Sequence, residues 1–134
     1  MATVDYKREL DDLIDIVSGE HGSDIHLSVG SHPIIRVDGS LIPLVKKPVL
    51  TNRDLASFIE VLLTKEQEVK FLETREIDFS FAARDGVRFR GNGFFQRGAI
   101  SVALRHIPSM VRNFAELALP PVLESFTQRP QGFF

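Results

Sequence analysis

The sequence contains no cysteine, and none of its five lysines lies beyond residue 70. The absence of cysteine excludes a disulfide scaffold, thiol catalysis and any Cys-ligated zinc or iron–sulfur site, and it agrees with a reducing compartment. No apolar run approaches the roughly 18 residues that a membrane-spanning helix needs. The opening segment, MATVDYKRELDD, is too acidic and polar for a signal peptide. These absences predict a globular domain that folds without disulfides.

Length and charge distribution add the next constraints. The chain has 134 residues, 43% of them hydrophobic and 25% charged, which suits one globular domain or one domain plus a short appendage. Its net charge of −2 hides a division, because residues 1–81 carry 9 basic and 15 acidic side chains, whereas residues 82–134 carry 7 and 3. The seven later basic residues are all arginine, which suits planar contacts with carboxylates or phosphates. A basic face that is simply exposed to solvent explains this uneven distribution of charge equally well at this point.

The first half of the chain predicts helices and short strands. Apolar side chains recur at helical spacing over residues 4–18. Alternating apolar and polar side chains predict a half-buried strand over residues 24–29, and a second short strand over residues 34–37 leads into the hairpin signal Asp38-Gly39.

Two further helices are predicted by N-terminal capping boxes, which pair Thr51 with Asp54 and Thr64 with Gln67. The first of them has a continuous apolar face. The second is shorter, and its expected apolar contacts are Val69, Phe71 and Leu72.

From residue 76 onward, apolar and polar residues alternate through three consecutive strands that end near Ile107-Pro108. Arg97-Gly98 suits a two-residue turn, which places Gln96 across from Ala99 and Arg90 across from Arg105. For the preceding hairpin we prefer a three-residue loop over residues 84–86, with Gly86 left-handed, because it aligns the apolar faces of the two strands. Overall, residues 1–108 are predicted to form one α+β domain with helices on an antiparallel sheet.

This register gathers Arg88, Arg90 and Arg105 on one face of the sheet. Like charges directly opposite each other destabilise a sheet by a few tenths of a kcal/mol to about 1 kcal/mol. The cluster therefore favours an anionic partner. The alternative is internal neutralisation by Asp78, from which a diagonal contact reaches Arg90.

Several familiar motifs are incomplete. Gly91-Asn92-Gly93 begins a GxGxxG sequence, but the third glycine and the following helix are missing. An RNA-recognition strand would need stacking aromatics where Asn92 and Arg97 stand. No GxxxxGK[ST] sequence occurs, so the chain has no phosphate-binding loop of its own. We find neither a metal-ligand spacing nor a nucleophile elbow, and we expect no metal site and no catalytic residue.

Six short segments together resemble one family. They are Ser23-Asp24-Ile25-His26-Leu27, Ile35-Arg36-Val37-Asp38-Gly39, Asp78-Phe79-Ser80-Phe81, Val87-Arg88-Phe89-Arg90-Gly91-Asn92, Gln96-Arg97-Gly98 and Leu104-Arg105-His106-Ile107-Pro108. In order and spacing they are similar to the N-terminal part of type IV pilus retraction ATPases (PilT-like), in the secretion and traffic ATPase superfamily. The resemblance covers nearly the whole chain.

The resemblance implies a PAS-like domain over residues 1–108, then a linker and the truncated start of a RecA-like ATPase domain over residues 109–134. It implies a cytoplasmic homo-hexameric motor, peripheral to the inner-membrane pilus machinery, that uses ATP and Mg²⁺. Gly132-Phe133-Phe134 resembles the strand that precedes the P-loop, so we interpret the chain as a non-catalytic fragment. The fragment alone is expected to bind no cofactor and no nucleic acid.

In this family, arginines of the N-terminal domain reach the phosphates of ATP bound at a RecA-like domain of the ring. By motif position these are Arg90 and Arg105, with Arg88, Arg97 and Asp78 as possible supporting residues. Two alternatives stand beside this interpretation. The chain could be a free-standing PAS-like sensor or interaction domain, or it could bind single-stranded nucleic acid with its arginine face.

Overall fold

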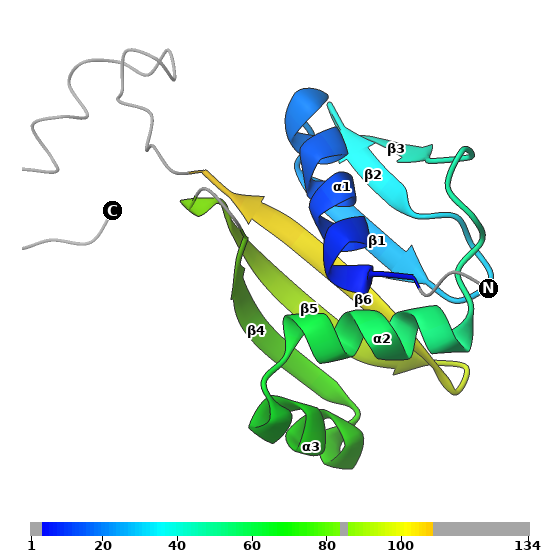
Figure 1. Cartoon of the computed structure of the whole chain (residues 1–134), viewed down its shortest axis with the longest axis vertical. Helices are drawn as coiled ribbons and strands as arrows, with labels where there is room; N and C mark the ends of the chain where they lie inside the picture. Colours follow the sequence, from blue (N-terminus) through cyan, green and yellow to red (C-terminus); the bar gives the residue numbers. More distant parts are fainter. Residues whose placement is uncertain (1–3, 84–85, 109–134) are drawn as a thin grey trace, which may run out of the picture.

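The structure, a computed structural model, describes residues 4–83 and 86–108 (Figure 1). The predicted linker and ATPase-domain segment, residues 109–134, lies outside the described residues. The elements of the described part are, in chain order, α1 (Tyr6–Gly19), β1 (Asp24–Ser28), β2 (Ile34–Val37), β3 (Ser40–Pro43), α2 (Asn52–Leu62), α3 (Lys65–Thr74), β4 (Glu76–Ala82), β5 (Arg88–Gln96) and β6 (Ala99–Ile107).

Helices α2 and α3 begin where the sequence predicts, whereas α1 begins at Tyr6, two residues after its predicted start. The side chains of Thr51 and Thr64 accept hydrogen bonds at the N-termini of α2 and α3, and both capping boxes are complete. The apolar faces of α1 and α2 are buried. The prediction for α3 is partly wrong, because Phe71 is buried whereas Val69 and Leu72 are 58% and 65% exposed. A ten-residue helix at the end of the sheet buries only the side chain that faces the sheet.

The six strands form one antiparallel sheet in the order β3-β2-β1-β6-β5-β4. The hairpin turns have the predicted backbone, with positive φ at Asp38 and Gly39 (51° and 79°) and at Arg97 and Gly98 (52° and 76°). Gly86 has the predicted left-handed backbone, with φ 74°, and the register between β4 and β5 is the expected one. Strands β1 and β6, far apart in the sequence, lie side by side at the centre (Figure 1).

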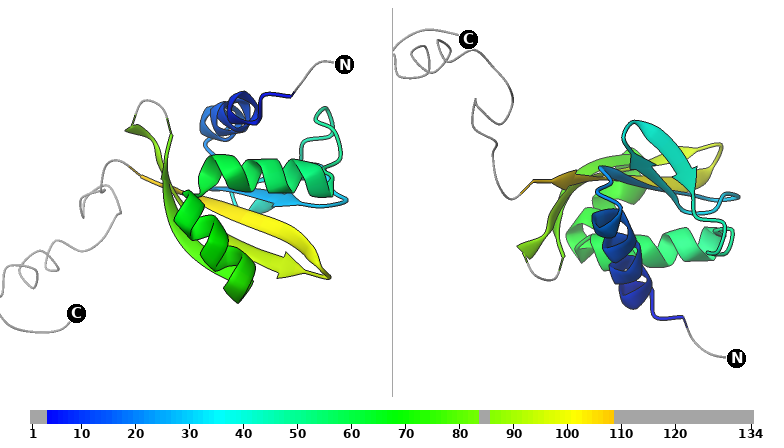
Figure 2. Two further views of the ribbon diagram at one scale, coloured as in Figure 1. Left: turned by 60° about the horizontal axis from the view of Figure 1, so that its bottom comes forward. Right: turned by 90° about the horizontal axis from the view of Figure 1, so that it is seen from above.

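The sheet has one face covered by helices and one that no described helix covers. All three helices pack on the same side (Figure 2). On that side a row of buried residues crosses five strands, namely Ile35, Ile25, Leu104, Gly91 and Phe79. The predicted α+β class, with helices on an antiparallel sheet, is confirmed. The uncovered side is called the open face below.

A hydrogen bond joins α1 to α2 on the helix side. The hydroxyl of Tyr6 donates to Oδ1 of Asp54 at 2.7 Å, and its ring meets Phe58 edge-on at 5.3 Å. This bond to Asp54, together with burial, raises the pKa of the Tyr6 hydroxyl above its ordinary value. Burial acts to raise the pKa of Asp54, but the hydrogen bonds from Tyr6 and Thr51 outweigh burial and leave that pKa below its ordinary value.

Replacing Tyr6 by phenylalanine should remove this bond and keep the ring. We expect the free energy of unfolding at pH 7 to fall by about 1 kcal/mol, since the bond is half-buried and its acceptor is charged. The lowered pKa of Asp54 means that its contribution exists above the unfolded-state pKa and is lost as pH falls through the folded one. Urea unfolding at pH 7 and pH 3 tests this. An equal difference between wild type and variant at both pH values would contradict it.

Candidate anion-binding face

The register brings a row of polar side chains together on the open face. Asp24 on β1 is paired with Arg36 on β2 and with Arg105 on β6, and Arg105 is in turn paired with Arg90 on β5. Arg90 is paired with Ser80 on β4. These five residues, called the polar row, occupy equivalent positions on adjacent strands, so their side chains point to the same side. The row contains three arginines and one carboxylate, and two of the arginines are directly beside the carboxylate.

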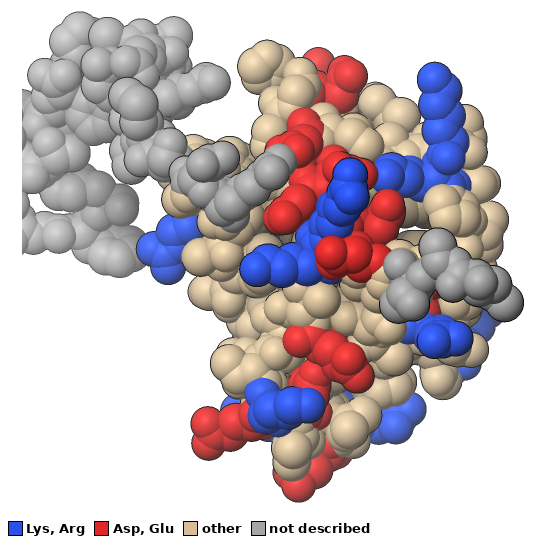
Figure 3. Space-filling model, in the orientation of Figure 1, with Lys and Arg blue, Asp and Glu red and all other residues tan. Residues whose placement is uncertain are grey.

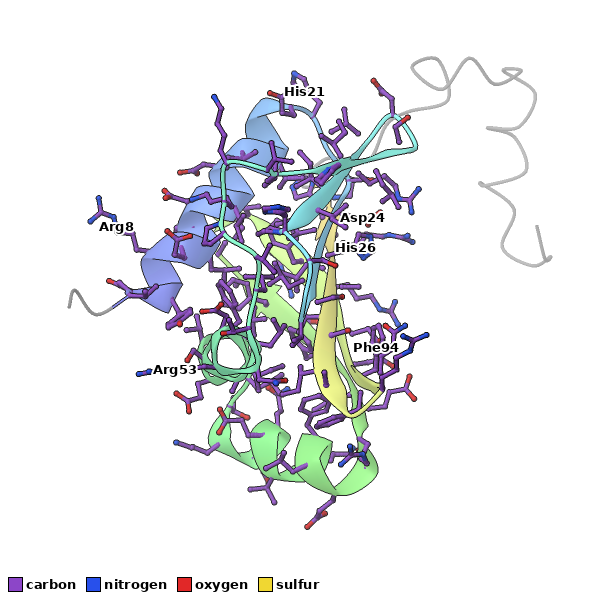
Figure 4. The ribbon with its side chains drawn as sticks, turned by 90° about the vertical axis from the view of Figure 1, so that its right-hand side faces the viewer. Arg8, His21, Asp24, His26, Arg53 and Phe94 are labelled. Atoms are coloured by element: carbon purple, nitrogen blue, oxygen red, sulfur yellow. The ribbon has the colours of Figure 1, made fainter. Side chains whose placement is uncertain are left out.

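Asp24 forms the centre of the polar row. Its side chain is only 6% exposed, and it makes ion pairs with Nε of Arg105 at 3.0 Å and with Nε of Arg36 at 3.2 Å. The Arg105 side chain is 76% exposed, so the carboxylate is held inside while the guanidinium reaches solvent. Figure 4 shows Asp24 and His26 pointing away from the helices, whereas Arg8 and Arg53 lie on the helix side.

Arg90 and Arg105 stand directly opposite each other, as the register argument predicts. Arg90 is exposed, and within residues 4–83 and 86–108 its side chain makes no ion pair or hydrogen bond. Arg88 is exposed one row further along β5, beside Ile107. Arg97 is not part of this group of arginines. It lies in the β5–β6 turn, seven residues from Arg90, and seven residues of strand span roughly 23 Å.

Asp78 lies across from Asn92, as the register predicts, but it does not make the diagonal contact with Arg90. Its Oδ1 accepts a hydrogen bond from Nδ2 of Asn92 at 2.9 Å, and among the described residues no ion pair joins it to an arginine. The internal carboxylate that neutralises an arginine of the cluster is Asp24.

The polar row borders a shallow hollow of about 230 Å³ in the open face. His26 lies in its wall, and its Nε2 is buried with no hydrogen-bond partner among the described residues. Buried polar atoms are normally hydrogen-bonded, so this nitrogen is an exception in the described part of the chain. In the described ranges no group of three acidic or histidine side chains is placed to hold a metal ion. The three arginines that line the hollow, Arg36, Arg90 and Arg105, give it the chemistry of an anion site.

The helix side offers a less suitable place for an anion. A hollow of about 330 Å³ lies between α1 and α2 and is lined mostly by apolar side chains. Its Lys47 already contacts Glu9 at 3.4 Å and Asp12 at 3.5 Å. Acidic side chains also gather over this side of the molecule (Figure 3).

Asp24 and Arg36 were missed as site residues by the sequence reasoning. The alternating pattern placed Asp24 on the polar face of its strand, and a polar position in a half-buried strand is ordinarily exposed. Only the pairing of β1 with β6 shows that Asp24 lies beside Arg105, 81 residues away in the chain.

The comparisons with known proteins agree with this architecture. No protein-family model matches the sequence. The chain is 32% identical over 124 residues to the type IV pilus retraction ATPase PilT of Pseudomonas aeruginosa, and 28% identical over 124 residues to the type IV pilus ATPase PilU of the same bacterium. Each alignment covers 92% of this chain, but 36% of PilT and 32% of PilU. The chain thus spans about a third of the length of these relatives.

Two solved structures share the fold. A crystal structure of the pilus retraction motor PilT with bound ADP superposes with a TM-score of 0.77 at 34% identity, over 88% of this chain and 34% of that one. The ATPase DotB of Legionella pneumophila superposes with a TM-score of 0.70 over 98% of this chain and 37% of that one, at 22% identity, which shows the fold alone.

The PAS-like α+β fold is therefore that of the N-terminal domain of PilT-like secretion ATPases. The chain is a homologue of the N-terminal region of the type IV pilus ATPases PilT and PilU. Among the described residues, no helix is both long and apolar enough to cross a membrane.

Proposed function

We propose that this chain is the N-terminal regulatory module, residues 1–108, of a hexameric ATPase motor that drives type IV pilus retraction. Residues 109–134 would link the module to a RecA-like ATPase domain and begin that domain. The motor would work in the cytoplasm, at the inner-membrane pilus machinery. The observation that carries the proposal is the similarity to PilT, which has been solved as a pilus retraction motor with bound ADP.

Within such a motor, Arg90 and Arg105 would contact the phosphates of ATP bound at a RecA-like domain of the same or a neighbouring subunit. Two exposed guanidinium groups on paired strands can meet one phosphate group from adjacent directions. A cation at the transferring phosphoryl group stabilises the charge of the transition state. Arg88, one row away, could add to the local positive potential.

The chain would contribute no catalytic residue, because it has no GxxxxGK[ST] sequence. The P-loop lysine, the Mg²⁺ ligands and the catalytic glutamate would belong to the RecA-like domain. Closure of the arginine face over the nucleotide would then couple the position of this module to the nucleotide state of the ring.

The test is ATP turnover by the motor that carries this domain. Arg90→Ala and Arg105→Ala are each expected to lower turnover by at least about tenfold, since each removes a cation from the transferring phosphate. Arg97→Ala is the matched control, because it removes an exposed arginine outside the cluster and should leave turnover unchanged. Size-exclusion chromatography should show that all three variants still form hexamers. Unchanged turnover in both Arg90→Ala and Arg105→Ala would refute the phosphate-contacting role.

A further inference from the structure

Asp24 forms ion pairs with two arginines, although one cation is enough to compensate its charge. Among the described residues it is the one charged residue that is buried, at 4% exposed. A buried carboxylate without a cation is strongly destabilising, and one cation is enough to compensate it. Asp24 nevertheless contacts an arginine on each side, Arg36 from β2 and Arg105 from β6, and its Oδ2 also accepts a bond from Oγ of Ser23 at 3.3 Å.

The two arginines are held differently. Arg36 is 37% exposed, and besides its contact with Asp24 it donates from Nη1 to the backbone oxygen of Gly39 at 3.1 Å. The side chain of Arg105 is 76% exposed, and its one hydrogen bond or ion pair in the described part of the chain is the bond from Nε to Asp24. Arg36 is therefore fixed at two points and Arg105 at one. Of the two arginines, Arg105 is the one that can break its ion pair with Asp24 and move.

We propose that Asp24 is an internal anion that holds Arg105 until a phosphate group replaces it, and that Arg36 keeps Asp24 paired once Arg105 has moved. The inference rests on the proposed phosphate role of Arg90 and Arg105. Asp24 and Arg36 are positioning residues in this scheme, since they act through Arg105.

The exchange is electrostatically balanced in both states. Before the exchange, Asp24 compensates Arg105, which otherwise faces the like charge of Arg90 directly. After it, the phosphate lies between Arg90 and Arg105 and relieves the same repulsion. The buried carboxylate keeps Arg36 throughout, so the movement of Arg105 leaves no buried charge without a partner.

The 134-residue chain itself can test the exchange, with inorganic tripolyphosphate as the probe. In a proton–nitrogen NMR spectrum, the Nε–H of Arg105 should be protected from solvent in the wild type and lose that protection when tripolyphosphate is added. Asp24→Asn keeps an acceptor oxygen but removes the charge, so it should weaken the protection before any anion is added. It should also raise the affinity for tripolyphosphate by about threefold to fivefold, the effect of removing one exposed ion-pair contact.

Glu76→Gln is the matched control for charge. It removes the same single negative charge from the same face of the sheet, but Glu76 lies four residues from Ser80 along β4, outside the lining of the hollow, and among the described residues makes no ion pair with Arg105. Its effect on tripolyphosphate affinity should stay below about twofold. Arg105 should remain protected in this variant.

A second variant changes the affinity in the opposite direction. Arg36→Gln removes the cation that takes over Asp24, so Arg105 should stay protected at higher tripolyphosphate concentrations and affinity should fall by about threefold. Arg53→Gln is the matched control, because it removes an exposed arginine on the helix side (Figure 4). Arg53→Gln should change neither the protection of Arg105 nor the affinity for tripolyphosphate.

The possible outcomes separate this inference from the function on which it rests. Unaltered Arg105 protection in Asp24→Asn would overturn the holding role of Asp24. Equal affinity gains in Asp24→Asn and Glu76→Gln would overturn the exchange and leave only a general charge effect. If tripolyphosphate perturbs neither Arg90 nor Arg105 in any variant, including Asp24→Asn, the exchange is overturned, whereas the phosphate role in the motor is decided separately by the ATP turnover of Arg90→Ala and Arg105→Ala.

Discussion

Replacement of Gly91 by alanine is expected to lower the free energy of unfolding by roughly 2–3 kcal/mol and the melting temperature by roughly 10–20 °C. Gly91 lies on the helix side of β5, directly beneath the ring of Phe79 on β4. A Cβ at this position would come within 2.3, 2.5 and 2.8 Å of three ring atoms of Phe79. The ring is in the core, 5% exposed, so moving it disturbs its neighbours.

Gly93 provides the control, two residues along the same face of the same strand. A Cβ there would meet Ile77 at 3.4 Å and Phe71 at 3.6 Å, which is ordinary contact. Gly93→Ala should therefore change stability by less than about 1 kcal/mol. Gly91→Ala should also cost much less in a Phe79→Leu background, because the smaller side chain leaves room for the methyl group. Equal decreases in melting temperature for Gly91→Ala and Gly93→Ala would show that the position of the Phe79 ring does not require a glycine at Gly91.

The two glycines illustrate what sequence reasoning can and cannot supply. The sequence rejects a dinucleotide-binding loop at residues 91–93 and places both glycines on the apolar face of a strand. It cannot say why glycine is needed at Gly91. That reason lies in Phe79, whose ring crosses to the next strand, and a side-chain orientation of this kind is a property of the packed core.

The part of the fold that the sequence predicts well is local. The pairing of Arg90 with Arg105 follows from a two-residue turn at Arg97-Gly98, and the pairing of Ser80 with Arg90 follows from the preceding loop. A hairpin turn fixes the register of its own two strands, so the alternating pattern and the turn residues are sufficient. The helix starts at Thr51 and Thr64 are local for the same reason.

The central contact of the site could not be obtained in this way. Asp24 and Arg105 belong to strands joined through most of the domain, and no turn fixes the register between β1 and β6. Arg88, Arg90 and Arg105 could be named from the sequence, yet Arg36 and the carboxylate between Arg36 and Arg105 could not. The first three arginines were found by hairpin register and by family resemblance, whereas Asp24 required the non-local pairing.

The same non-local pairing leads to the second large effect, the loss of stability when both arginines around Asp24 are removed. Arg36→Ala alone, or Arg105→Ala alone, should cost less than about 1 kcal/mol, since the other arginine still compensates the carboxylate and both guanidinium groups reach solvent. The double variant should lose about 3 kcal/mol or more, because the 6% exposed carboxylate would then have only the hydroxyl of Ser23 as a side-chain partner among the described residues.

Urea unfolding of the wild type, the two single variants and the double variant measures this coupling as a double-mutant cycle. The control is the same cycle in an Asp24→Asn background, where no buried charge exists and the two arginine substitutions should become additive. Additivity in the wild-type background would mean that solvent or another group reaches Asp24 when both arginines are gone. A coupling of about 1–2 kcal/mol that disappears with Asp24→Asn would show that either arginine suffices to compensate the carboxylate. That sufficiency is the property that lets Arg105 leave Asp24 for another anion while the sheet stays folded.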